Sequence, residues 1–246
     1  MKSQERHKLK ENEFARTVEH AREVLSTRQR DITWIVVVVV ALLAIVGGYT
    51  WWRNSTASRG TDLLASALAV YEAPVVPAAA PAPGSLPPVQ QPGTYLTEQS
   101  KLEAALPKFI EAADKYPSTT AGITARYHAA SILANLGRYG EAEQRFQEVV
   151  SRAGSTLYGQ TGKLGLAEVQ VAQKKYDSAI GIYTELSRNT GSHMPIDGIL
   201  MQLGRAYALA GRKEEAVRTF TRVTDEFPTS MYSSDARREL EDVKKS

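Results

Sequence analysis

Apolar residues recur from residue 105 onwards at one fixed helical spacing. A small residue is followed four positions later by an aromatic residue and seven positions later by another apolar residue. This spacing places all three on one face of an α-helix. The triplet occurs four times, 37 residues apart, which predicts a stacked array of helical repeats. Its members are Ala105/Phe109/Ala112, Ala142/Phe146/Val149, Ala179/Tyr183/Leu186 and Ala216/Phe220/Val223.

The residues before each triplet complete a helical hairpin. Apolar runs such as residues 132–136 and 203–210 precede the second and fourth triplets, and Gly137 and Gly211 follow them where a turn is required. The final segment, residues 231–245, is charged and has few apolar positions. Because an array must cover its terminal apolar face, we expect this segment to be a capping helix.

A second pattern is an uninterrupted apolar run at residues 32–52, ITWIVVVVVALLAIVGGYTWW, which contains no charged residue. At 1.5 Å per residue it is long enough to cross a hydrocarbon core of about 30 Å. Trp34 stands near one end and Trp51 near the other, where amphipathic rings favour the membrane interface. Bulky residues replace the small ones of a signal-peptide cleavage site, so the run predicts a retained transmembrane helix.

Basic residues predict the orientation of this helix. Eight lysines and arginines precede the run, whereas the first fifteen residues after it hold only Arg53 and Arg59. Lysine and arginine favour the cytoplasmic side. We therefore expect a single-pass protein of the bacterial inner membrane, with its N-terminus in the cytoplasm and its repeats in the periplasm.

The segments that flank the apolar run are predicted to be helical. Residues 1–31 carry Phe14, Val18, Ala21 and Leu25 at helical intervals, which indicates a cytosolic amphipathic helix. It would lie on the membrane surface, dock on a partner, or simply extend the apolar helix into solvent. Residues 53–72 are expected to form a juxtamembrane helix, with Leu64, Leu68 and Tyr71 on a shared face.

Residues 73–93 contain seven prolines and therefore form an extended linker and not a helix. The linker either interrupts the first hairpin or holds the array, residues 94–246, away from the membrane. The spacing favours an interruption. Ala65 is 40 residues from Ala105, whereas Gly204 is 12 residues from Ala216, so 28 residues would be inserted.

Candidate catalytic chemistry is scarce. The chain has no cysteine, and its four histidines are scattered without metal-ligand spacing. The segment from Gly159 to Leu164 resembles a phosphate-binding loop only in part, because Leu157 and Leu164 replace its required glycine and hydroxyl residue. Beyond the apolar run 22 basic residues face 21 acidic ones, so nothing indicates nucleic-acid binding. We expect no enzymatic activity, cofactor or metal.

The last repeat, LGRAYALAGRKEEAVRTFTRVTDEFP at residues 203–228, resembles the tetratricopeptide repeat family. The family's conserved leucine-glycine pair, tyrosine, turn glycine, alanine, aromatic residue and closing proline correspond to Leu203-Gly204, Tyr207, Gly211, Ala216, Phe220 and Pro228. The period exceeds the family's usual 34 or so residues. The resemblance implies an all-α array of three to four repeats plus the cap, and a concave groove that binds peptides. The groove residues it implies here are Tyr127, Ser131, Asn135, Leu164, Glu168, Met201 and Arg205.

The whole arrangement, an N-terminal anchor followed by an array of this size, is similar to the ancillary subunits of the bacterial SecYEG translocon. That resemblance implies the translocon and periplasmic chaperones as partners. A cell-division or outer-membrane assembly coordinator with the same repeats is the alternative. A mitochondrial import receptor, which would reverse the topology, and an enzyme with an unrecognised site are more distant ones.

Overall fold

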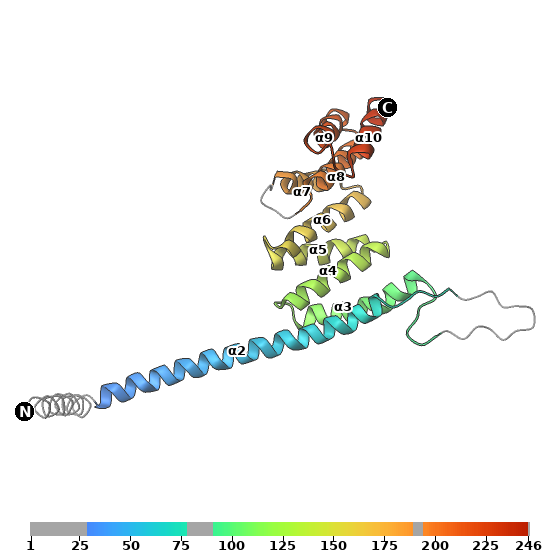
Figure 1. Cartoon of the computed structure of the whole chain (residues 1–246). Coiled ribbons are helices and arrows are strands. Elements are labelled where there is room, and N and C mark those ends of the chain that lie inside the picture. The colour runs from blue at the N-terminus through green and yellow to red at the C-terminus, as the bar shows by residue number, and fades with distance from the viewer. Residues whose placement is uncertain (1–28, 78–90, 189–193, 246) are drawn as a thin grey trace, which may run out of the picture. The chain divides into compact units, whose positions relative to one another are not determined.

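The structure, a computed structural model, describes residues 29–77, 91–188 and 194–245, and in this part of the chain it is all-helical with one isolated β-bridge. The all-α array predicted from the sequence is confirmed (Figure 1). Its helices are α2 (Gln29–Tyr71), α3 (Glu98–Lys115), α4 (Thr120–Asn135), α5 (Tyr139–Ala153), α6 (Leu157–Ala172), α7 (Tyr176–Arg188), α8 (Ile196–Leu209), α9 (Lys213–Glu226) and α10 (Ser233–Lys245).

Contacts along the chain divide it into two units, Met1–Ser55 and Thr56–Ser246, and α2 contributes to both. The sequence predicted two successive helices, at residues 32–52 and 53–72, whereas the structure has the single helix α2. No proline interrupts these residues, and the glycine pair Gly47-Gly48 does not end the helix. The predicted amphipathic helix of residues 1–31 lies almost entirely outside the described residues.

The part of α2 in the first unit exposes its apolar side chains; Trp51, for example, is 73% exposed. The most apolar 18-residue window of this helix has a mean hydropathy of 2.3, and none of it is buried. The helix is therefore long and apolar enough to cross a membrane, a property that it shares with signal sequences.

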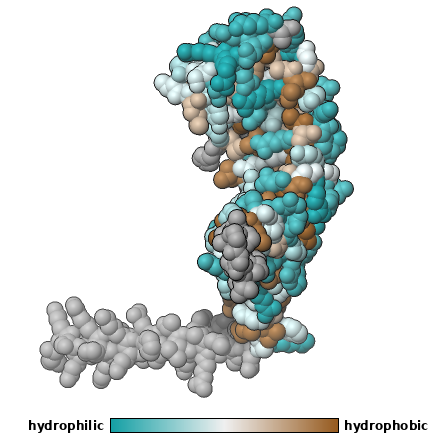
Figure 2. Space-filling model, turned by 90° about the vertical axis from the view of Figure 1, so that its right-hand side faces the viewer, coloured by the Kyte–Doolittle hydropathy of each residue, from teal (hydrophilic) through white to brown (hydrophobic). Residues whose placement is uncertain are grey.

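In the second unit, α4 to α9 form three successive hairpins, each made of an earlier and a later helix (Figure 1). The four alanines of the repeated triplets are fully buried, and the aromatic residues that follow them are at most 3% exposed. These side chains belong to two apolar clusters, one around α3 to α5 and one around α6 to α10. The cap α10 buries Ala236 and packs Leu240 and Val243 against the second cluster. The surface on the face shown in Figure 2 is mostly hydrophilic.

The C-terminal part of α2 supplies the missing first helix of the hairpin that ends in α3. Tyr71 contacts Phe109 edge-on at 5.9 Å between ring centroids, and Leu64 and Leu68 pack against the same cluster. The small residue of this segment that is fully buried in the cluster is Ala67, whereas Ala65, from which the length of the insertion was counted, is exposed. Ala67 lies three residues after Leu64 and four before Tyr71, so it belongs to the face that Leu64, Leu68 and Tyr71 were expected to share.

The proline-rich segment is therefore inserted within a hairpin. Its two ends are held together, because the Val76 amide donates to the Tyr95 carbonyl at 2.8 Å and the Tyr95 amide donates to the Pro74 carbonyl at 3.0 Å. Residues 78–90 lie outside the described residues.

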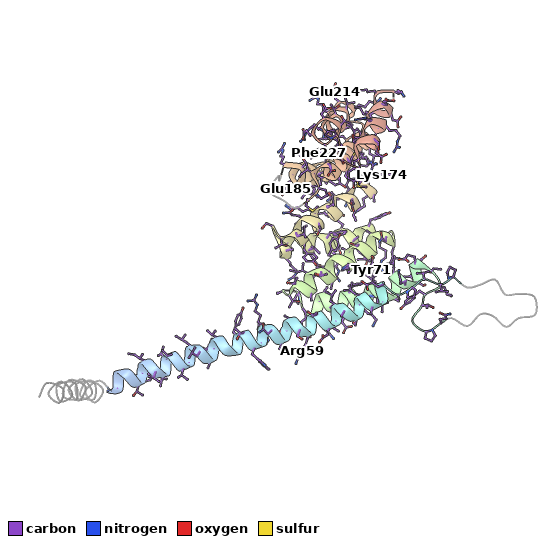
Figure 3. All side chains as sticks on the ribbon, viewed as in Figure 1. Arg59, Tyr71, Lys174, Glu185, Glu214 and Phe227 are labelled. Carbon is purple, nitrogen blue, oxygen red and sulfur yellow. The ribbon has the colours of Figure 1, made fainter. Side chains whose placement is uncertain are left out.

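The turns inside the three complete hairpins share one backbone conformation. The residue in the left-handed region is Gly137 in the first turn, Lys174 in the second and Gly211 in the third, with φ of 74°, 62° and 74°. These positions are 37 residues apart, and Figure 3 shows Lys174 between α6 and α7. A left-handed conformation suits glycine, because a Cβ crowds the following carbonyl oxygen. Lys174 therefore adopts a conformation that the array elsewhere gives to glycine.

We expect Lys174→Gly to raise the stability of the array by about 0.5–1 kcal/mol. Relief of left-handed strain, about 1–2 kcal/mol, exceeds the extra unfolded-state entropy of glycine, about 0.5–1 kcal/mol. The reverse change at the equivalent turn, Gly211→Lys, should lower stability by a similar amount. Thermal unfolding followed by circular dichroism measures both, and shifts of the same sign would contradict the shared turn geometry.

Candidate functional site

The best-supported candidate site is a pocket of about 200 Å³ between α4, α5 and α6. It opens between the first helices of two successive hairpins, α4 and α6, which contact each other directly. Its lining residues are Tyr127, Ser131, Ala134 and Asn135 from α4, Tyr139 and Phe146 from α5, and Gly165, Glu168, Val169 and Ala172 from α6.

Four of the seven predicted groove residues line this pocket, namely Tyr127, Ser131, Asn135 and Glu168. Three come from successive turns of α4, because positions 127, 131 and 135 repeat at helical spacing. Glu168 stands on α6 at the position equivalent to Ser131, 37 residues further on. The register of the repeat thus brings the two helices' equivalent faces to the same opening.

The other three predicted groove residues lie elsewhere. Leu164 is half-buried and packs against the second apolar cluster. Met201 is 1% exposed in that cluster, so it supports packing and does not line an open groove. Arg205 donates to Glu239 of the cap at 2.8 Å from Nε, and its Nη2 lies 2.6 Å from the same carboxylate. The cap therefore supplies a charge partner at the last position where the sequence predicted an open face.

Sequence reasoning missed Tyr139, Phe146 and Gly165 as lining residues. Phe146 belongs to a core triplet, and it reaches the pocket because Gly165 leaves room for its ring. A Cβ built on Gly165 would lie 2.4 Å from Cζ of Phe146. The spacing of an aromatic residue and a glycine 19 positions apart could have indicated this contact, but only once the pairing of α5 with α6 was known.

Glu168 is the only charged residue among those that line the pocket. Its side chain is exposed by surface area, yet desolvation by the neighbouring helices raises the pKa of its carboxyl. Burial, with a smaller effect from the Glu168 charge, raises the pKa of the Tyr183 phenol beneath it. Within residues 29–77, 91–188 and 194–245, Glu168 makes no hydrogen bond or ion pair.

A neighbouring carboxylate, Glu143, is in the opposite situation. It accepts from Lys175 at 2.7 Å, from Gln173 at 2.9 Å and from Gln170 at 3.4 Å. The hydrogen bond from Lys175 is the largest of the effects that lower the pKa of Glu143. Glu143 is thus satisfied by its own array, whereas Glu168 is left for solvent or a ligand.

A second, larger cavity of about 450 Å³ lies beside α3. Apolar side chains of α3 line it together with Leu136 and Arg138 from the turn between α4 and α5. Arg138 is already paired with Glu141 at 2.6 Å, and Glu103 accepts a hydrogen bond from Gln99 at 2.8 Å. Its polar groups therefore have partners within the chain, unlike Glu168.

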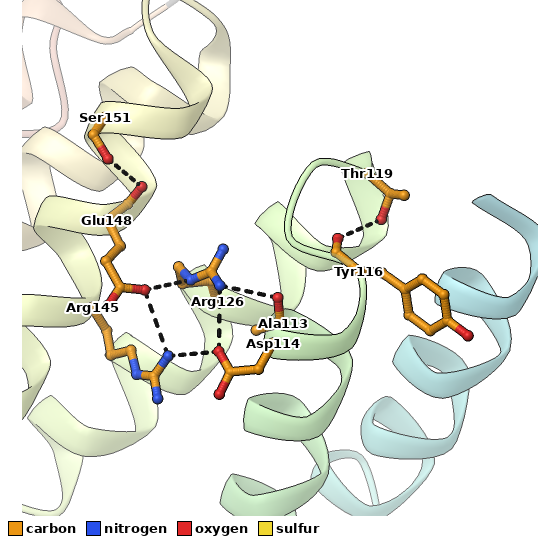
Figure 4. A network of polar contacts seen from close by, with 8 residues as sticks. All are labelled: Ala113, Asp114, Tyr116, Thr119, Arg126, Arg145, Glu148 and Ser151. Atoms are coloured by element: carbon orange, nitrogen blue, oxygen red, sulfur yellow. Dashed lines mark hydrogen bonds and ion pairs between the residues drawn. The ribbon is translucent and has the colours of Figure 1, made fainter. Parts of the chain in front are cut away.

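A buried arginine joins three helices near the pocket. Arg126 of α4 is 2% exposed; its Nη2 donates to the Ala113 carbonyl at 3.0 Å, and its Nε lies 2.7 Å from Glu148 of α5 (Figure 4). Arg145 bridges Asp114 and the same Glu148 at 3.0 and 3.5 Å. The network therefore connects α3, α4 and α5. Both carboxylates remain partly exposed, so their charges are paired without being fully removed from water.

His128 stacks on Phe109 at 5.1 Å between ring centroids, and its ring centroid lies 5.7 and 5.9 Å from those of Tyr71 and Tyr127. Burial lowers the pKa of its imidazole, and the Glu72 carboxylate opposes that shift weakly. The neutral ring therefore completes the aromatic contact between α2, α3 and α4. In the described part of the chain, no three histidine or acidic residues gather closely enough to hold a metal ion.

Comparison with known proteins agrees with this hairpin geometry. A family model for the tetratricopeptide repeat-like domain matches residues 29–234, which include α2 as well as the repeats. The chain belongs to this tetratricopeptide repeat-like family. Members of such families are typically non-catalytic scaffolds that bind proteins or peptides. No curated protein matches the chain.

Several solved structures are similar to the tetratricopeptide array. TPR-like repeats of a putative kinesin light chain from Podosopora anserina share 14% identity at a TM-score of 0.52, over 59% of this chain and 79% of that one. BtubC from P. vanneervenii shares 16% identity at a TM-score of 0.52, over 60% of this chain and 67% of that one. A tetratricopeptide repeat protein from Parabacteroides merdae shares 16% identity at a TM-score of 0.50, over 60% of this chain and 55% of that one. At these identities the likeness shows the fold alone.

We expect the stability of the array to fall as the pH drops below about 6.5, the value for an unperturbed histidine. The unfolded state then binds a proton at His128 that the folded state, with its lowered pKa, does not bind. His128→Phe keeps the aromatic contact and removes this proton, so it should flatten the dependence of melting temperature on pH between 7.5 and 5. Equal slopes for both proteins would contradict the assignment.

Proposed function

We propose that the chain is a membrane-anchored scaffold that binds extended segments of other proteins in the groove between α4 and α6. One observation carries this proposal: a single family match from residue 29 to 234 joins an exposed apolar helix to an array with an open pocket between its hairpins. Anchoring raises the effective concentration of the groove for partners at the same membrane, without new contacts.

The proposed topology places the array in the periplasm of a bacterial inner membrane. Its support is the excess of lysine and arginine before residue 32 over the short segment after residue 52. Subunits of the translocon and periplasmic chaperones are the proposed partners, on the strength of the architectural resemblance of the whole chain. The 37-residue period and the inserted proline-rich segment set this chain apart from a generic array.

Protease added to spheroplasts should digest the array and spare the segment before residue 32. Lysine and arginine retained on the cytoplasmic side keep that segment inside the cell. Antibodies against each end of the chain report which part survives, and a cytosolic marker protein controls for leakage. Protection of the array would reverse the proposed orientation and remove periplasmic partners from consideration.

Blocking the groove should reduce crosslinking to partners in native membranes without unfolding the array. Asn135→Trp places a bulky ring at an exposed lining position, and Gln147→Trp, at an exposed position of α5 outside the pocket, is its matched control. Deletion of residues 1–52 should weaken the same crosslinks, because tethering is lost while the groove survives.

The measurement is the set and yield of crosslinked proteins, identified by mass spectrometry, for folded variants. We expect SecYEG subunits or periplasmic chaperones among the partners lost in Asn135→Trp and retained in Gln147→Trp. Recovery of division or outer-membrane assembly proteins instead would favour the alternative function. An unchanged partner set in Asn135→Trp would show that binding lies outside this groove.

A further inference from the structure

We propose that the pocket between α4, α5 and α6 is a specificity pocket for one basic side chain, a lysine or an arginine, of the bound segment. The inference rests on the proposed peptide-binding function and names the ligand chemistry of its groove. It assigns a role to Glu168, Tyr127 and Tyr139, which line the pocket.

The size of the pocket fits one side chain. Its volume of about 200 Å³ lies below the range of about 300–1,000 Å³ that is usual for small-molecule sites. Extended peptides bound by helical or sheet surfaces gain affinity along their length and specificity from individual side-chain pockets. A pocket of this volume therefore discriminates at one position of a peptide.

The charge of the pocket selects a cation. Glu168 is its only charged lining residue, and within the part of the chain that the structure describes no lysine, arginine or histidine pairs with it. The equivalent positions in the neighbouring hairpins do not repeat this charge. Ser131 is neutral, and Arg205 is paired with Glu239 of the cap. The array thus offers an unpaired carboxylate at one of its three equivalent positions.

Aromatic rings line the same pocket as this carboxylate. Tyr127 and Phe146 meet edge to face at 5.9 Å between centroids, and Tyr139, 38% exposed, lines the rim. The face of an aromatic ring attracts ammonium and guanidinium groups, most strongly where water is displaced. The chain makes such a contact within itself, since the Arg212 guanidinium lies 4.9 Å from the ring centre of Tyr207.

The remaining polar groups suit a donor. Ammonium and guanidinium groups only donate hydrogen bonds, so they need several acceptors. The Ser131 hydroxyl and the Asn135 side-chain carbonyl line the same pocket as the Glu168 carboxylate. Desolvation without a compensating partner is also what raises the pKa of Glu168, and an incoming cation would supply that partner. An acidic or C-terminal carboxylate ligand would meet repulsion at the same place.

The test begins with a library of random decapeptides fixed on a surface and probed with the purified full chain in detergent. Lysine and arginine should be enriched among the bound peptides. A strongly bound peptide and its version with the basic residue replaced by norleucine, an uncharged analogue of similar shape, are then titrated by fluorescence anisotropy. We expect the basic peptide to bind about tenfold more tightly, as one charge contact with aromatic support predicts.

Three variants assign the preference to the pocket. Glu168→Gln should abolish the difference between the two peptides and leave norleucine binding unchanged. Tyr139→Leu, which keeps apolar area but removes the ring, should reduce the difference in part. Glu214→Gln, an exposed glutamate on α9 outside the pocket (Figure 3), is the matched control and should keep the full difference. Melting curves establish that every variant is folded.

The outcomes separate this inference from the proposed function. Bound peptides without a basic preference, or a preference that survives in Glu168→Gln, would overturn the inference and leave peptide binding by the groove intact. If the protein bound none of the peptides in the library, the proposed function would be overturned and the inference with it. Enrichment of acidic residues would show that the pocket selects the opposite charge.

Discussion

Close approach of helices around an aromatic ring is the constraint on which the array depends. Phe146 lies against the backbone of Gly165 in the next hairpin, and Phe220 lies against that of Gly204 in its own hairpin. A Cβ atom added to either glycine would lie only 2.4 or 2.5 Å from a carbon of the ring. Any side chain at these glycines would force the helices apart or the ring out of the core. The same contact between α5 and α6 also forms part of the wall of the candidate pocket, so Phe146 both packs in the core and lines that pocket.

An ion pair between the two helices of a hairpin occurs at equivalent positions in two successive hairpins. Arg126 and Glu148 join the two helices of one hairpin, and Lys163 and Glu185, each 37 residues further on, lie 2.5 Å apart in the next. In the third hairpin the first position is the buried Leu200, and the pair is absent there. The Lys163–Glu185 pair is largely exposed and contributes little to stability. Arg126 is buried, so it needs Glu148 as a partner for its charge. Charges used in this way are unavailable to ligands, which makes an unpaired carboxylate within the same array chemically distinct.

Periodicity predicted the core of the fold well and its open face less well. The alanine and aromatic positions are buried as their spacing implied, because burial follows from the helical face alone. Ala65 and Met201 show where that reasoning stops. Ala67 and not Ala65 is the small residue buried in the first cluster, and Met201 is in the core although its equivalent Tyr127 lines a pocket. Which equivalent position stays open depends on neighbouring helices and on the cap, and these are tertiary contacts that a repeat length does not encode.

The two ends of the proline-rich insertion are hydrogen-bonded to each other, so the segment is a closed loop and not a spacer. Since Pro74 and Val76 are hydrogen-bonded to Tyr95, the chain leaves the array and returns to the same place. Its length then sets no distance between the apolar helix and the repeats, and lengthening such a loop costs little free energy. The insertion is a site where the protein could acquire a second binding motif, or lose one, while the repeats stay unaltered.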